Sequence, residues 1–156
     1  MKKLSATLFG LFAVIGLLAI SVATAQAQGR YRGKAYSKAD VDRIIKRVEE
    51  RGDAFRKAVD RHLDRSRLDD TKAEDRINRQ VKQLEEALDE LRSEFDRRDR
   101  WQETRANVEK VIGEANEINA LMRNGRFGPA IEREWTLLRA DLNKLAGIYN
   151  LRQLKS

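Results

Sequence analysis

Histidine and methionine are the residue types of this 156-residue chain that could hold a cofactor, and each offers one internal candidate ligand. The single histidine, His62, lies three residues after Val59 on an apolar helical face, and Met122 closes a later apolar face. In a bundle whose first and third helices run parallel, both side chains fall at one end, where a His–Met pair can ligate haem iron. Met122 is also an ordinary core filler, and His62 suits the edge of a core. We therefore expect no cofactor and keep His62 with Met122 as the haem-ligand alternative.

Other catalytic and metal-binding sites lack their residues. The chain has no cysteine, which excludes disulfides, thiolate metal sites and Cys-His pairs. No glutamate is followed by a histidine three residues later, so the di-iron site of helical bundles cannot be built. The two glycines of the segment 125–128 indicate a turn between helices rather than a phosphate-binding loop. We expect a protein that is not an enzyme, with no catalytic residues and no metal site.

The N-terminal segment has the pattern of a secretory signal peptide. Two lysines precede an uncharged, mostly apolar run over 4–23, and small residues follow it. We predict a signal peptide over 1–27 that is cleaved after Ala27, with cleavage after Ala25 as the alternative. If the segment stays uncleaved, its length suffices for an inner-membrane anchor. Both alternatives place the rest of the chain outside the cytoplasm, because lysines stay on the inner side. The expected location is periplasmic or secreted, in a bacterium.

The pattern of the remaining residues predicts helices. Charged residues make up 37% of the chain, and it contains a single proline. Apolar residues recur at steps of three and four, which is the period of a helix with one buried face. We call each such row an apolar stripe. The four stripes are Val41, Ile44, Ile45, Val48, Phe55, Ala58, Val59 and Leu63, with Gly52 in line; Ile77, Val81, Leu84, Leu88, Leu91 and Phe95; Trp101, Thr104, Val108, Val111, Ala115, Ile118 and Met122; and Ile131, Trp135, Leu138, Leu142, Leu145 and Tyr149.

Capping residues indicate where these helices begin and end. Ser37 and Thr71 each precede an acidic residue by three positions, as in a capping box. Pro129 suits the first position of the last helix. The step from Phe95 to Trp101 breaks the phase of the second stripe, which predicts a turn near 96–99. One long kinked helix over 71–124 is the alternative.

Short loops between helices of similar length favour an all-α, antiparallel up-down-up-down four-helix bundle. The predicted organisation is a signal peptide over 1–27, a flexible basic leader over 28–37 and a bundle domain over 38–156. The apolar residues after Asn150, Leu151 and Leu154, have the opportunity to pack on that domain.

Charge and location together suggest the class of partner. The full chain carries a net charge of +7, which becomes +5 without Lys2 and Lys3, and acidic and basic residues alternate along each helix. This alternation is typical of a solvated helix surface. We expect protein–protein interaction or cell-envelope structure, with another envelope or extracellular protein as partner. A periplasmic chaperone-like binder is the alternative.

The leader and the second stripe each suggest a further class of partner. Arginines and Lys34 surround Tyr31 in the leader, which is the pattern for binding a polyanion or an anionic membrane surface. Export argues against nucleic acid, and membrane contact is expected only if the signal segment is uncleaved. The regular heptads of the second stripe would also permit a homo-oligomer through a coiled coil.

Overall fold

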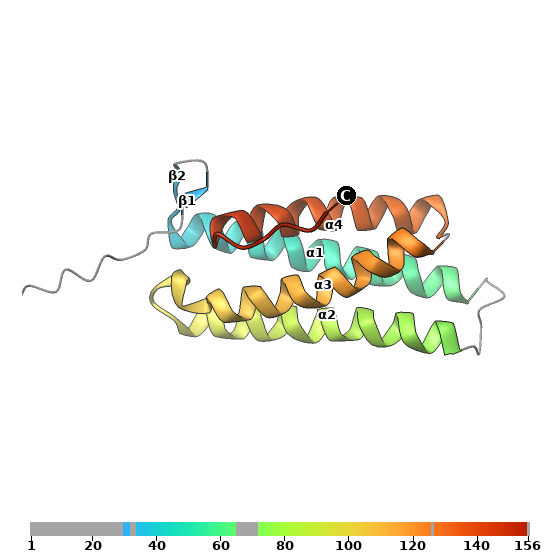
Figure 1. Cartoon of the computed structure of the whole chain (residues 1–156). Helices are drawn as coiled ribbons and strands as arrows, with labels where there is room; N and C mark the ends of the chain where they lie inside the picture. Colours follow the sequence, from blue (N-terminus) through green and yellow to red (C-terminus); the bar gives the residue numbers. More distant parts are fainter. Residues whose placement is uncertain (1–29, 32–33, 65–71, 126, 156) are drawn as a thin grey trace, which may run out of the picture.

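The computed structural model describes residues 30–31, 34–64, 72–125 and 127–155. Within these ranges the chain is all-helical apart from one short hairpin, as the apolar stripes predict (Figure 1). The elements in chain order are β1 (Arg30–Tyr31), β2 (Lys34–Ala35), α1 (Lys38–Leu63), α2 (Lys72–Arg97), the 3-10 helix η1 (Trp101–Thr104), α3 (Arg105–Asn124) and α4 (Pro129–Ile148).

The hairpin lies within the segment predicted as a flexible leader. Strands β1 and β2 pair antiparallel, with Arg30 opposite Ala35 and Tyr31 opposite Lys34. Such a ladder buries too little surface to stand alone. The predicted signal peptide lies outside the described residues. None of the described helices is long and apolar enough to cross a membrane.

Helix α1 begins at the predicted cap. The Asp40 amide donates to Ser37 Oγ at 3.1 Å, and the Ser37 amide donates to Asp40 Oδ2 at 3.1 Å. These reciprocal bonds form a capping box, which satisfies two backbone donors that the first turn leaves without helical partners. The corresponding prediction at Thr71 lies outside the described residues.

The second and third helices are separate, so the alternative of one kinked helix over 71–124 is wrong. Helix α2 ends at Arg97, and the chain resumes helical structure in η1 at Trp101. The phase break after Phe95 explains this: a continued helix would have turned Arg98 toward the core. The N-cap of η1 is Arg100, which makes no side-chain cap bond.

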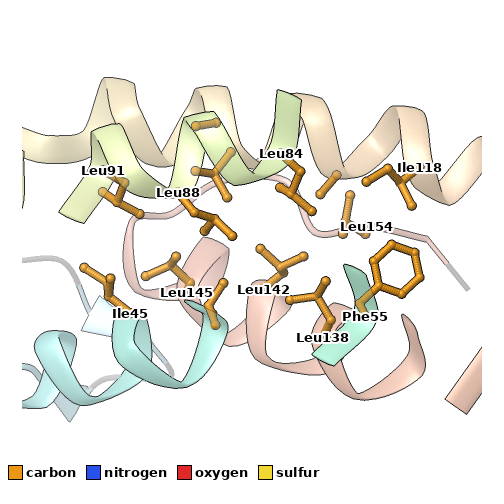
Figure 2. Packing of buried hydrophobic residues seen from close by; sticks show 14 of the residues in the cluster. Ile45, Phe55, Leu84, Leu88, Leu91, Ile118, Leu138, Leu142, Leu145 and Leu154 are labelled. Atoms are coloured by element: carbon orange, nitrogen blue, oxygen red, sulfur yellow. The ribbon is translucent and has the colours of Figure 1, made fainter. Parts of the chain in front are cut away.

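One hydrophobic core joins all four helices (Figure 2). The members of the four stripes are buried, except that Ile44 and Met122 are only half-buried. Gly52 lies in the stripe of α1 because a Cβ there would come within 3.1 Å of Leu88 Cδ1 on α2. The glycine therefore permits a close approach of α1 and α2.

The helices pack most extensively as two pairs, α1 with α4 and α2 with α3 (Figure 1). Charged side chains join α1 to α2 along their outer side. Arg92 donates to Asp42 Oδ1 at 2.7 Å and to Glu49 Oε2 at 2.9 Å, and Arg56 donates to Glu85 Oε2 at 2.6 Å. The Arg92 pairs connect the first half of α1 with the last part of α2, and the Arg56 pair connects the second half of α1 with the middle of α2.

Candidate functional site

The predicted haem-ligand pair lies toward the end of the molecule that holds the α3–α4 turn. His62 is half-buried in the last turn of α1, and its ring centroid lies 6.4 Å from that of Phe127. A Cβ on Gly128 would lie 3.7 Å from His62 Nδ1, so the ring packs against the turn. Met122, in the last turn of α3, packs against the core. The expectation of no cofactor, with His62 and Met122 as the haem-ligand alternative, stays a prediction.

Other predicted site residues take no further part. Ala25 and Ala27, the predicted cleavage positions, lie outside the described residues. In the described ranges, no group of three or more histidine, aspartate and glutamate side chains is arranged to hold a metal ion.

One buried carboxylate, Asp141, interrupts the apolar face of α4. It receives a hydrogen bond from Lys144 at 2.8 Å and lies 3.9 Å from Arg47 of α1, so it joins helices.

The most distinctive site is the segment after α4, residues 150–155, which we call the C-terminal strap. Asn150 adopts a left-handed conformation with φ of 54°. The Leu151 amide donates to Ala146 O at 2.8 Å, and the Asn150 amide donates to Gly147 O at 3.3 Å. This is a Schellman motif, in which a left-handed residue ends a helix and reverses the chain. The strap consequently runs back along α4 (Figure 1).

Asparagine side chains on the bundle bind the backbone of the strap. The Leu154 amide donates to Asn143 Oδ1 at 2.7 Å, and Asn143 Nδ2 donates to Leu154 O at 3.2 Å. This pair of bonds imitates the exchange between two residues of a β-ladder. Further along, Asn119 Nδ2 donates to Lys155 O at 2.9 Å, and Arg139 Nη1 donates to the same oxygen at 3.3 Å.

Asn119 is itself held in place. It is 3% exposed, and its Oδ1 accepts a hydrogen bond from Trp135 Nε1 at 3.2 Å. The Trp135 ring in turn packs on Phe55, with centroids 5.3 Å apart. Because the Trp135 indole holds Asn119 Oδ1, the Nδ2 donor of Asn119 is directed at the strap by a bond that does not involve the strap.

A single side chain anchors the strap in the core. Leu154 is 6% exposed and belongs to the same cluster as Ile118 and Phe55 (Figure 2). Leu151 is half-buried at the edge of that cluster, whereas Arg152, Gln153 and Lys155 are exposed. Although exposed, Gln153 donates from Nε2 to the Asn143 carbonyl at 3.2 Å. The bundle thus recognises the strap mainly by backbone bonds and one leucine, with one further bond from a strap side chain.

The root of the strap is fixed at Tyr149. Its hydroxyl lies 2.8 Å from Thr104 Oγ1 and 3.1 Å from Trp101 O, and its ring meets the Trp101 ring edge-on at 5.1 Å. Burial raises the pKa of Tyr149 to about 12, although the bond to Thr104 opposes the shift. Arg105 also donates to the Tyr149 carbonyl. The strap therefore starts from a rigid point.

A cleft opens between the strap and α3. It has a volume of about 520 Å³ and is lined by α3 from Glu109 to Arg123 and by the strap from Leu151 to Lys155. Its walls combine apolar side chains with the amides of Asn116 and Asn119 and with charged side chains, among them Glu109 and Arg123. A concave surface that joins apolar side chains to polar groups is suited to binding.

Sequence reasoning missed the two asparagines of this site. Asn119 and Asn143 each directly follow a stripe residue, Ile118 and Leu142, so each lies at the margin of an apolar face. Their position at the margin of an apolar face was the signal available in the sequence, and it does not reveal which segment each asparagine binds. Packing of Leu151 and Leu154 was anticipated, whereas their backbone bonds were not.

The groups of the bundle that bond to the backbone of the strap are the neutral amides of Asn119 and Asn143 and the guanidinium of Arg139. Comparison with protein-family models, with curated proteins and with solved structures found no match for this chain. Its function must therefore be inferred from the site and the sequence.

Proposed function

We propose that the chain is an exported, non-enzymatic helical bundle that binds another protein of the cell envelope or the extracellular space. The N-terminal pattern of Lys2, Lys3, the apolar run over 4–23 and Ala27 supports export. The helix order that we propose for the bundle is antiparallel, up-down-up-down. The pairs between the beginning of α1 and the end of α2 support that order.

The observation that carries the binding function is the cleft between α3 and the strap. It is the place where neutral amides and apolar side chains of the bundle face a polypeptide backbone. Many charged side chains elsewhere on the bundle form ion pairs with one another. Burial alone would lower the pKa of Arg92, but hydrogen bonds with Glu49 and Asp42 raise it above its usual range. A cation so engaged contributes little to an interface with a polyanion.

A chaperone-like role receives less support. Chaperones for unfolded clients need extended exposed apolar surface. In the described part of the chain, Leu137 is the large apolar side chain that is exposed. A defined partner suits this surface better than a range of unfolded clients.

Crosslinking in the native envelope tests the binding function. A photoreactive residue replaces Asn116, which is exposed beside the cleft, and a matched control replaces Arg133, an exposed residue of α4. We expect a discrete crosslinked protein from the first variant and not from the second. Equal labelling of many proteins by both variants would contradict the proposal.

Export is tested separately by mass spectrometry of the purified protein. We expect a mature N-terminus at Gln28, or at Gln26 if cleavage follows Ala25. A protein that retains Met1 and stays in the cytoplasmic fraction would refute export. A protein that retains Met1 in the membrane fraction would instead support the anchored alternative.

A further inference from the structure

The strap occupies the bundle as a bound peptide would. It is extended, its backbone bonds to the side chains of Asn143, Asn119 and Arg139, and its one buried anchor is Leu154. Recognition through backbone bonds does not depend on the side chains of the bound segment. Arg152 illustrates this, since its side chain is exposed. Gln153 adds one side-chain bond, from its Nε2 to the Asn143 carbonyl at 3.2 Å.

The attachment also suits exchange. The strap is joined to α4 by the turn at Asn150, so a change in that turn can release it without moving α4. Its root at Tyr149 remains fixed by bonds to Trp101 and Thr104. The groups left behind stay ordered, because Trp135 holds Asn119 in place from within the core. A vacated groove would therefore keep its shape and present the same donors and acceptors.

From these features we propose that the groove between α3 and α4 is a binding site for an extended, leucine-bearing segment of another protein, and that the strap is its built-in competitor. The partner segment takes the place of residues 151–155. Its leucine enters the position of Leu154, and its backbone bonds to Asn143 and Asn119. The cleft beside the strap gives the incoming segment room to begin contact. This inference rests on the proposed function and names the surface and the chemistry of the partner.

Competition from the strap determines how tightly the groove binds a free segment. A tethered segment experiences an effective concentration of about millimolar, so a free segment of equal intrinsic affinity binds weakly. Weakening the strap without altering the groove should raise the affinity for a free segment. Leu154→Asp does this, because a carboxylate cannot enter the apolar position, while every groove residue is unchanged.

The experiment measures binding of a fluorescent peptide with the sequence of residues 150–156. The full chain is expressed with its own N-terminus as wild type, as Leu154→Asp and as Leu154→Asp with Asn143→Ala. We expect the peptide to bind Leu154→Asp at least about tenfold more tightly than wild type, and the second substitution to weaken that binding about tenfold. A peptide carrying aspartate in place of its second leucine is the control and should not bind.

Three results would overturn the inference. If Leu154→Asp retains its helical circular dichroism and does not bind the peptide, the inference is overturned. If it unfolds, Leu154→Ala replaces it in the same assay, and unfolding of both would show that the strap belongs to the core and is not exchangeable. Dimers of the wild type that disappear in Leu154→Asp would assign the groove to a second copy and overturn the proposed partner. None of these results alters the crosslinking test, so failure of the inference is distinguishable from failure of the proposed function.

Discussion

Asn143→Ala removes the two hydrogen bonds that hold the middle of the strap. In the folded protein, the Asn143 amide accepts from the Leu154 N–H and donates to the Leu154 carbonyl. Alanine retains high helix propensity, so α4 itself should not suffer. The substitution therefore acts on the strap and not on the helix that carries it.

The expected effect is limited by the free energy with which the strap binds. Two hydrogen bonds contribute about 1–3 kcal/mol. The whole strap gains about 2–3 kcal/mol from burying Leu154 and about 2.5–7.5 kcal/mol from five hydrogen bonds. Ordering about five residues costs about 5–10 kcal/mol. Because these contributions nearly balance, Asn143→Ala should release the strap while lowering the global free energy of unfolding by no more than about 1–3 kcal/mol.

Hydrogen exchange and denaturant unfolding together measure the two effects. In the wild type, the Leu154 amide should exchange more slowly than the amide of an unbonded terminal residue. In Asn143→Ala it should lose at least about tenfold of its protection, while amides in the middle of α1 lose less. Asn143→Asp keeps an oxygen for the Leu154 amide and should be intermediate. Asn116→Ala, in the same cleft, should leave strap exchange unchanged.

The reasoning would be refuted by either of two results. A loss of more than about 4 kcal/mol in urea unfolding would mean that the strap cannot leave alone. Unchanged exchange at Leu154 would mean that the asparagine bonds do not hold it.

Three other predictions concern the ends of the helices and the ion pairs. Asn150→Ala should cost about 1 kcal/mol in thermal unfolding, whereas Asn150→Gly should be neutral or stabilising, because a Cβ opposes the left-handed conformation; equal effects would contradict the assigned turn. Tyr149→Phe should lower the free energy of unfolding by about 1–2 kcal/mol, because Thr104 loses the Tyr149 hydroxyl as a partner. An unchanged free energy of unfolding in urea would mean that this bond does not stabilise the fold. Hydrogen bonds, of which the one from Lys46 has the largest effect, lower the pKa of Asp42. The ionised carboxylate of Asp42 therefore stabilises the fold above the ordinary aspartate pKa of about 4, and this stabilisation is lost as the pH falls below it. Asp42→Asn should flatten that part of the stability curve, and a curve of unchanged slope would count against the pair.

The sequence alone determined the helices and their buried faces. Helical periodicity is local, so the spacing from Ile77 to Phe95 identifies a buried face without knowledge of what covers it. Caps are local too, and the Ser37–Asp40 capping box formed as predicted. The phase break between Phe95 and Trp101 likewise separated α2 from α3. These features follow from residues within one or two turns of each other.

The tertiary structure decided what fills the margins of those faces. Gly52 became a close contact because Leu88 of another helix lies opposite it. Asn119 and Asn143 became a binding surface because a Schellman turn at Asn150 returns the chain across them. No spacing in the sequence joins residues 119, 143 and 154, since their meeting depends on how α3 and α4 pack. The sequence could indicate that Leu154 would be buried, but the groove that receives it exists only in the folded bundle.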